Sequence, residues 1–435
     1  MNKDIILSRH FDRRVNSPLG FLLCAVCTIL LALLLLAAST LLPQQRIDRH
    51  VLSSSASLLA EGLYPKFHDY GKESQLDNFT DAIMLEEARG TTRTNISSIL
   101  TNPRHSCEES ANPVEELAIY ATEDADSPAS WSYARYWMGF RVLLRFWLSF
   151  FSYLEIRRYL SFAFFLLFII NILAISKHTN SQIALFFALS IVLVRPQTIA
   201  SSMQFSCCFF IVFFALLAVP SIYRNDAYEG LFFFELGMIT QYFDFYTTPL
   251  LTFGYPMVYL FLLHNQKGAR LCGKRVFKAA VLWAVGYVLM WIAKLAVTTW
   301  LTDVDGFADG FDKMFIRIGI HKDERYLNEY NPLVGLYNVF FRGLTDDRMS
   351  RAVALAGIIM VVAVCVFYLY KKRLSLYALS ANRSLLFLGF LPIVWFIFSA
   401  EPTAIHFWFQ YRNIALSYWA LGAWLASSIS GRAIA

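Results

Sequence analysis

The sequence carries little charge for its length. Only 16% of its 435 residues are Asp, Glu, Lys or Arg, whereas a soluble globular domain averages about 25%. Hydrophobic residues reach 57% of the chain, and Phe alone occurs 39 times. A water-soluble fold could not bury this much apolar surface, so the composition predicts an integral membrane protein.

The sequence also lacks the common motifs of nucleotide and metal chemistry. It contains no P-loop or other Gly-rich phosphate loop, no zinc motif and no GxSxG nucleophile elbow. These absences argue against direct use of a cytoplasmic nucleotide, and we predict neither a cofactor nor a metal site. The net charge of +6 does not indicate a nucleic-acid partner, because the basic residues fall between apolar segments, where they signal topology.

Cysteine is present but forms no framework. Five of the seven cysteines lie in apolar runs, Cys272 lies in a basic loop, and Cys107 alone lies in a long polar loop. This distribution predicts neither a disulfide framework nor a metal site, and the apolar cysteines are expected to act as small hydrophobic residues.

Apolar segments predict an all-α bundle of about ten transmembrane helices in one multi-span domain. The segments cover residues 19–42, 159–176, 182–194, 199–219, 230–240, 250–263, 276–301, 352–370, 385–398 and 414–428. The first of them is longer than the apolar core of a signal peptide, about 7–15 residues, so it is expected to remain as a span.

Basic residues fix the predicted orientation in the cell membrane. They gather before the first segment and in the stretches 267–278 and 371–383. Because cytoplasmic loops collect Lys and Arg, both termini and these stretches are predicted to be cytoplasmic. The loops 43–158 and 302–350 are then extracytoplasmic. Within the second of them, residues 303–312 (DVDGFADGFD) lack the spacing of a calcium loop and are expected to form a turn-rich loop.

The first outer loop is the candidate chemical part of the molecule. In residues 43–140, acidic residues outnumber basic ones 15 to 8. Its stretch 75–88, QLDNFTDAIMLEEA, places Asp77 and Asp81 on one face if it is helical. Either carboxylate is a candidate catalytic base, although Asp77 could instead cap the helix that follows it.

The end of this loop interleaves arginines with aromatic residues. Residues 129–160 are too charged for the centre of a bilayer and are expected to form interfacial helices. Two interpretations remain open: an aromatic belt with snorkelling arginines, or a surface that receives a lipid phosphate.

Further polar residues converge on the predicted outer face and form a candidate substrate-binding set. Arginines can hold a phosphate with two parallel hydrogen bonds and stabilise it as it leaves, and a carboxylate can take the proton of a hydroxyl. Lys294 could also snorkel to the interface, and His406 could be a packing residue. The set comprises Arg135, Arg141, Arg195, Asp244, Lys294, His406, Tyr411 and Arg412.

This layout resembles the GT-C superfamily of multi-span glycosyltransferases. The motifs DNFTDAIML, ARYWMGF, FDFYTTPL and IHFWFQYR are also similar to those of bacterial membrane proteins of surface-polysaccharide loci. The resemblance implies a polyprenyl-phosphate-linked sugar as donor and a cell-surface or lipid-linked glycan as acceptor. It also implies a catalytic Asp soon after the first span, whereas Asp77 lies some 35 residues beyond that span.

Other functions are weighed against this one. A transporter or lipid flippase would use the intramembrane charges as a pathway, but the chain has no internal repeat. A polysaccharide polymerase or ligase would use similar outer arginines and a histidine. In a non-enzymatic scaffold the convergence of acids and arginines would be incidental.

The predicted orientation can be tested by labelling two cysteines. In single-cysteine variants on intact cells, an impermeant maleimide should modify Cys107 and leave Cys272 unmodified until the membrane is opened. Labelling of Cys272 alone in intact cells would reverse the predicted orientation.

Overall fold

The computed structural model describes residues 17–67, 72–91, 97–105, 110, 112–123, 131–266, 271–320, 332–342 and 376–428. Helices form nearly all of the regular structure in these residues. The strands β1 (Pro103–Arg104) and β2 (Trp131–Ser132) pair antiparallel over two residues each. The prediction of an all-α membrane protein is therefore confirmed.

Four helices of the described residues are long and apolar enough to span a membrane. They are α2 (Pro18–Ser39), α8 (Tyr153–His178), α11 (Met203–Arg224) and α14 (Gly273–Leu301), with mean hydropathies of 3.0, 2.3, 2.5 and 1.9. Each exceeds the ~20 residues that cross the hydrocarbon core of a bilayer. The predicted apolar segments are thus realised as spans at these four places.

The other described helices of the bundle are too short for full spans, so the prediction of about ten spans is not supported. At a rise of ~1.5 Å per residue they fall short of the ~30 Å hydrocarbon core. The sequence pattern located apolar residues but not every helix end: α8, for example, begins at Tyr153 rather than near residue 159. The short helices are α9 (Ser181–Val192), α12 (Glu229–Phe243), α13 (Leu250–Gln266), α19 (Arg383–Phe398) and α22 (Ile414–Ser428). The segment 352–370 lies outside the described residues.

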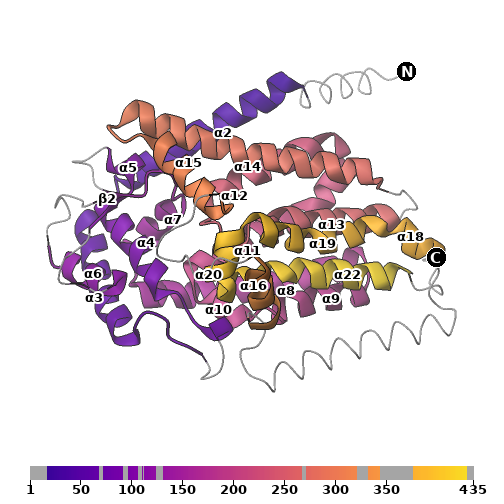
Figure 1. Cartoon of the computed structure of the whole chain (residues 1–435), viewed down its shortest axis with the longest axis horizontal. Helices are drawn as coiled ribbons and strands as arrows, with labels where there is room; N and C mark the ends of the chain where they lie inside the picture. The colour runs from indigo at the N-terminus through magenta and orange to yellow at the C-terminus, as the bar shows by residue number, and fades with distance from the viewer. Residues whose placement is uncertain are drawn as a thin grey trace.

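A small helical unit, which we call the head, sits at one end of the bundle. In Figure 1 the head lies at the left, and α13, α14, α19 and α22 run from it along the long axis of the molecule. Ile47, Leu85, Leu117 and Leu144 belong to its own buried apolar core. The head comprises α3 (Gln44–Glu61), η1 (Lys72–Ser74), α4 (Asn78–Gly90), α5 (Ser98–Thr101), α6 (Pro113–Tyr120) and α7 (Phe140–Leu148).

Short elements complete the two ends of the bundle. Helix α15 begins at Gly306, where the Asp305 carboxylate accepts the Ala308 N–H at 3.0 Å. The expectation of a turn-rich loop at residues 303–312 was therefore wrong, because this cap and the four-residue spacing of Phe307, Phe311 and Phe315 favour a helix. The remaining elements are α10 (Pro196–Ala200), η2 (Asp226–Tyr228), α15 (Gly306–Arg317), α16 (Pro332–Tyr337), η4 (Asn338–Arg342), α18 (Leu376–Ala381), α20 (Ala400–Ile405), α21 (Phe407–Gln410) and η5 (Tyr411–Asn413).

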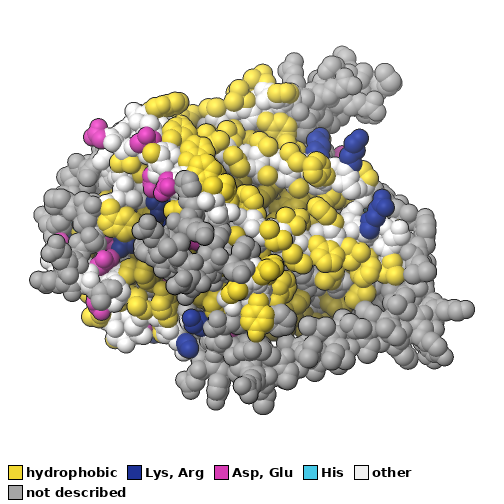
Figure 2. All heavy atoms as spheres, viewed as in Figure 1, with side chains coloured by type: hydrophobic (Ala, Val, Ile, Leu, Met, Phe, Trp, Pro, Cys, Tyr) yellow, Lys and Arg dark blue, Asp and Glu magenta, His cyan; other side chains and the backbone are white. Residues whose placement is uncertain are grey.

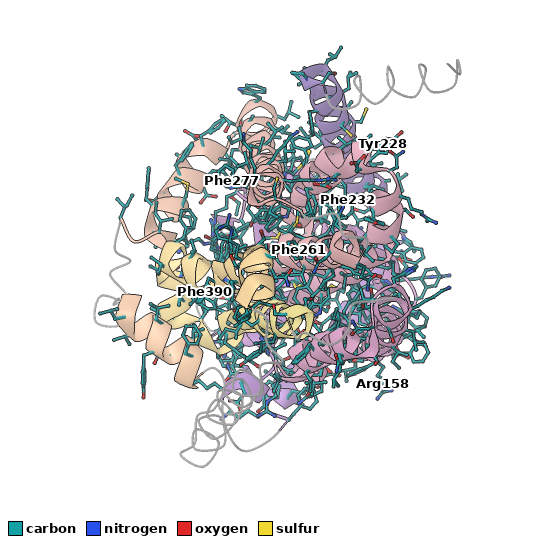
Figure 3. All side chains as sticks on the ribbon, turned by 90° about the vertical axis from the view of Figure 1, so that its right-hand side faces the viewer. Arg158, Tyr228, Phe232, Phe261, Phe277 and Phe390 are labelled. Carbon is teal, nitrogen blue, oxygen red and sulfur yellow. The ribbon has the colours of Figure 1, made fainter. Side chains whose placement is uncertain are left out.

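The surface has the band pattern of a membrane protein. In Figure 2, hydrophobic side chains cover the middle of the visible face, while the charged ones gather toward its two ends. Among the residues labelled in the end-on view of Figure 3, Phe277 and Phe390 are 64% and 54% exposed, whereas Phe261 is 2% exposed. Exposed aromatic side chains of this kind match a lipid environment.

Helices α12 and α14 cross at two glycines. A Cβ atom at Gly237 would lie 2.0 Å from the Trp283 carbonyl oxygen, and one at Gly286 would lie 2.0 Å from the Phe234 carbonyl oxygen. Small residues at such a crossing let two backbones approach closely in a membrane. This contact fixes α14 against α12, and both helices contribute to the cavity described below.

We expect Gly286→Ala to destabilise the protein by roughly 1–3 kcal/mol, because the added methyl group forces the two backbones apart. Thermal unfolding of the purified protein in detergent measures the effect. Gly273→Ala on the same helix is the matched control, since a Cβ atom there meets nothing within 4 Å. Equal melting temperatures for the two variants would contradict the close crossing.

Candidate functional site

The structure gives Asp77 the role of a helix cap. It is the N-cap of α4: Oδ1 accepts the Thr80 N–H at 3.2 Å and Oδ2 accepts the Thr80 hydroxyl at 2.7 Å. Burial raises the pKa of Asp77 to about 7, against the opposing effects of the Thr80 hydrogen bonds and of Arg412. Both carboxylate oxygens of Asp77 therefore have partners within its own helix.

Asp81 lies one turn further along α4 and is fully buried. Its Oδ2 is 3.0 Å from Arg157 Nη2, and the Ser202 hydroxyl donates to Oδ1 at 3.5 Å. Arg157, on α8, also pairs with Glu61 at 2.7 Å and donates to Asn78. Asp81 thus belongs to a buried ion-pair network that ties the head to the bundle.

Three residues of the predicted substrate-binding set gather around η1, close to Asp77. Arg195 Nη2 lies 3.4 Å from Glu73 Oε1, and Arg412 Nη2 donates weakly to the Glu73 carbonyl oxygen at 3.5 Å. Arg412 is 1% exposed, and among the described residues its Nε and Nη1 have no hydrogen-bond partner. The Tyr411 hydroxyl donates to the Val194 carbonyl oxygen at 3.2 Å.

Arg141 and Lys294 lie buried between the head and α14, where they hold backbone carbonyls. Arg141 donates to Ile99 O at 2.7 Å and Ser98 O at 3.3 Å, and Lys294 donates to Leu100 O. These contacts fasten α5 against the bundle. Neither Arg141 nor Lys294 lines the cavity described next.

The described part of the chain holds a partly open cavity beside the head, with a volume of about 340 Å³. Helices α12, α14, α15 and α19 and the turn after α12 form its walls. Its size falls in the usual range of ligand sites, ~300–1,000 Å³, which are mostly apolar with a few polar groups. Its aromatic walls are Tyr136, Tyr246, Trp283, Tyr287, Trp291 and Trp395, and its polar residues include Arg135, Gln241, Asp244, Lys313 and Arg317.

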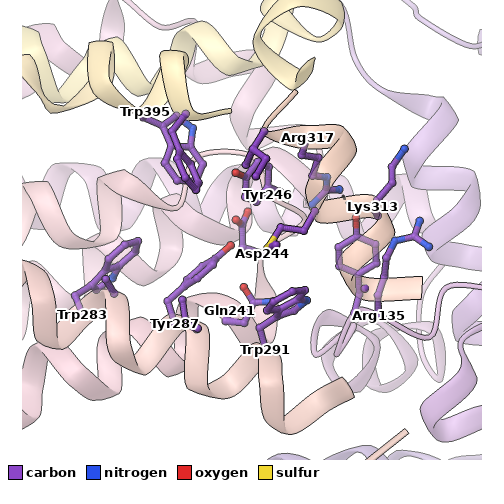
Figure 4. A pocket seen from close by; sticks show the side chains of 17 residues that line it. Arg135, Gln241, Asp244, Tyr246, Trp283, Tyr287, Trp291, Lys313, Arg317 and Trp395 are labelled. Atoms are coloured by element: carbon purple, nitrogen blue, oxygen red, sulfur yellow. Dashed lines mark hydrogen bonds between the residues drawn. The ribbon is translucent and has the colours of Figure 1, made fainter. Parts of the chain in front are cut away.

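Asp244 is the carboxylate of this cavity. Figure 4 shows it near the middle, with Trp283 and Trp395 on one side and Arg135, Lys313 and Arg317 on the other. Oδ1 accepts hydrogen bonds from the N–H and hydroxyl of Thr247 at 2.9 and 2.7 Å, and from the Cys208 thiol at 3.3 Å.

The second oxygen of Asp244 is uncommitted. Oδ2 has no hydrogen-bond partner among the described residues, although the side chain is only 6% exposed. Burial raises the pKa of this carboxyl, against the hydrogen bonds from Thr247, which lower it. One oxygen therefore fixes the group, while the other can accept a proton.

Three cationic residues line the cavity on the side away from Trp283 and Trp395. Arg135 pairs with Asp309 at 2.8 Å. Arg317 donates a hydrogen bond to the Tyr136 hydroxyl, and its guanidinium lies 4.6 Å from the Tyr246 ring centroid. Lys313 lies one turn before Arg317 on α15. The site therefore combines a buried carboxylate with a cationic wall.

Two titratable groups respond to these cations. Burial raises the pKa of Tyr136, but the charges of Arg317 and Arg135 outweigh that effect and leave the pKa below its ordinary value. Burial lowers the pKa of His406 to about 4, with further lowering by Arg317 and Lys313. The His406 ring, stacked 5.1 Å from Phe409, is therefore neutral at pH 7.

Of the ten predicted site residues, Arg135 and Asp244 line the cavity, and the roles of all ten stay predictions. Sequence reasoning missed Lys313 and Arg317, because it read the start of the second outer loop as turns. The helical spacing of three phenylalanines in α15 was the available signal. Among the described residues no group of three His, Cys, Asp or Glu side chains could hold a metal ion.

Comparison with known proteins yields no match to a family model, to a curated protein or to a solved structure.

Glu87 in the head provides a test of the buried charges. It is fully buried, and neither carboxylate oxygen has a hydrogen-bond partner among the described residues. Burial raises its pKa from 4.5 to about 8, against the opposing charge of Arg141. A raised pKa in the folded state means that the unfolded chain releases its proton first, so stability is lost as pH rises from 4.5 to about 8.

We expect Glu87→Gln to reduce this loss of stability, which for one such group is on the order of 1 kcal/mol per pH unit. Melting temperatures measured between pH 5 and pH 8 should fall less steeply for the variant than for the wild type. Glu123→Gln, at an exposed position, should keep the wild-type slope. An unchanged slope in Glu87→Gln would show that Glu87 stays ionised in the folded protein.

Proposed function

We propose that this protein is a membrane glycosyltransferase that moves a sugar from a polyprenyl-phosphate donor to a hydroxyl of a glycan or lipid-linked glycan. The observation that supports it best is the cavity, where Asp244 offers an oxygen without a partner opposite Arg135, Lys313 and Arg317. A base and a cationic wall are the two elements that such a transfer requires.

In the proposed reaction, the acceptor hydroxyl oxygen forms a bond to the anomeric carbon as the bond from that carbon to the phosphate oxygen breaks. Asp244 Oδ2 takes the proton of the hydroxyl. The bonding electrons leave with the phosphate, and the guanidiniums of Arg135 and Arg317 stabilise its added charge. No co-reactant is needed, because the donor supplies the energy of its own phosphate bond.

The lining of the cavity supports a lipid-linked sugar as the donor. Trp283, Tyr287 and Trp291 present aromatic faces from α14, one of the four full-length spans. These residues lie along the middle of α14, and Trp and Tyr rings combine an apolar body with a polar edge. They match a ligand that is part sugar and part isoprenoid. Under this proposal the cavity and the head face the extracytoplasmic side, and both termini are cytoplasmic.

The choice of Asp244 as base replaces the hypothesis based on Asp77 and Asp81. Both carboxylate oxygens of Asp77 accept hydrogen bonds from Thr80, and Asp81 forms an ion pair with Arg157. Using either as a base would cost a cap or a buried ion pair. Asp244 can accept a proton without losing an interaction at Oδ2.

A polysaccharide polymerase or ligase is the second candidate. It would use the same base and cations, and would differ in transferring a whole chain rather than one sugar. The volume of about 340 Å³ favours a small group at the reacting end. A transporter is less well supported, since a base placed opposite three cations is not needed to move a solute.

The test is transfer activity in Asp→Asn variants, with purified protein and a panel of polyprenyl-phosphate sugars. We expect Asp244→Asn to lower the transfer rate by about 10²–10⁴-fold, the range of a lost general base. Asn retains the oxygen that accepts from Thr247, so folding should be preserved. Asp226→Asn, at the opposite end of α12, is the matched control and should keep wild-type activity.

Asp77→Asn distinguishes the two assignments of the base. Asn is an equally good helix cap, so this variant should fold and retain most of its activity if Asp244 is the base. Loss of transfer in Asp77→Asn together with full activity in Asp244→Asn would return the chemistry to the head. No transfer by the wild type with any polyprenyl-phosphate sugar would contradict the proposed function itself.

A further inference from the structure

Each of the two arginines that line the cavity already has a hydrogen-bond partner within the protein. Arg135 Nη1 lies 2.8 Å from Asp309 Oδ1, a charged acceptor on α15. Arg317 Nη2 donates instead to the hydroxyl of Tyr136, a neutral acceptor. Both hydrogen bonds have an ionised donor, but the pair with Asp309 adds the attraction between opposite charges. An incoming anion therefore competes more easily for Arg317 than for Arg135.

Tyr136 is held in place by its backbone. Its carbonyl oxygen accepts from Asn102 Nδ2 at 2.7 Å, and its N–H donates to the Tyr133 carbonyl oxygen at 3.2 Å. The next residue, Trp137, is buried and donates from its indole to the Met290 carbonyl oxygen at 2.7 Å. The phenol thus projects into the cavity from a fixed point, while its ring lies 5.3 Å from the Arg317 guanidinium and 5.0 Å from that of Arg135.

Arg317 lies at the C-terminal end of α15. It is the last residue of the helix and is followed two residues later by Gly319, whose φ of +85° ends the helical path. A long side chain at a helix end can change its hydrogen-bond partner without moving the bundle.

We propose that Tyr136 is a built-in competitor of the anionic substrate: its hydroxyl oxygen takes the Arg317 donor that a phosphate oxygen takes on binding. The inference rests on the proposed phosphate-binding role of the cavity and adds a residue that limits its affinity. Binding then costs the hydrogen bond between Arg317 and Tyr136, and a weakly held anion without further contacts does not displace the phenol. Tyr136 in this way favours a ligand that also contacts the aromatic walls over free phosphate.

The experiment measures binding of inorganic pyrophosphate to the purified full-length protein in detergent by isothermal titration calorimetry. Tyr136→Phe removes the hydroxyl and keeps the ring against Phe245 and both guanidiniums. Because the hydroxyl no longer competes for the charged Arg317 donor, we expect the variant to bind at least about tenfold more tightly.

Two further variants separate this effect from a general change of structure. Tyr133→Phe is the matched control, because its ring also contacts the Arg135 guanidinium, at 4.7 Å, while it is not among the residues lining the cavity. It should bind pyrophosphate as the wild type does. Arg317→Gln should bind more weakly, and adding Tyr136→Phe to it should bring no gain, because the contested donor is gone.

The proposal is overturned if Tyr136→Phe binds pyrophosphate no more tightly than the wild type, including the case in which neither binds. It is equally overturned if the gain persists in the double variant with Arg317→Gln, or if Tyr133→Phe shows the same gain. The transfer assay keeps the two proposals distinguishable. Tighter pyrophosphate binding in Tyr136→Phe without transfer by the wild type supports the competitor role and contradicts the glycosyltransferase.

Discussion

The ion pairs of Arg157 join the two parts of the molecule. This arginine stands on the first turns of α8, a full-length span, and its guanidinium contacts Asp81, Asn78 and Glu61 of the head. A charge buried at a membrane boundary is costly unless it is paired and hydrogen-bonded. The partners come from two helices, α3 and α4, so satisfying this one charge fixes how the head sits on the bundle.

The same requirement organises the rest of the head. Arg145 donates to Ser39 O at the end of α2 and to Gln44 Oε1 at the start of α3, at 3.1 and 3.0 Å. Arg141 and Lys294 hold carbonyls at α5. Arg141, Arg145 and Lys294 therefore satisfy backbone groups in the protein interior, in keeping with the rule that buried polar groups need partners.

The cavity departs from this pattern, as Glu87 and Arg412 also do. Arg135 pairs with the partly exposed Asp309, and Arg317 donates to the uncharged phenol of Tyr136. Asp244 keeps one oxygen without a hydrogen-bond partner among the described residues. Incompletely matched polar groups lower stability, so they point to a place where the protein exchanges stability for binding or chemistry. The glycine crossing holds α12 and α14 together, and these two helices contribute Gln241 and Tyr287 to the cavity.

The sequence by itself determined that this is a helical membrane protein, because apolar runs of sufficient length leave no alternative to spanning helices. It also located the head, and it named Asp77 as a residue with two competing roles. It could not give the helix ends: α8 begins at Tyr153 rather than near residue 159, and α15 occupies a stretch that reads as turns. Only the tertiary structure decided which of many carboxylates and arginines share a site. That choice depends on which partners each group finds across the fold, as Asp81 finds Arg157 from 76 positions away, and no local pattern encodes such distant pairings.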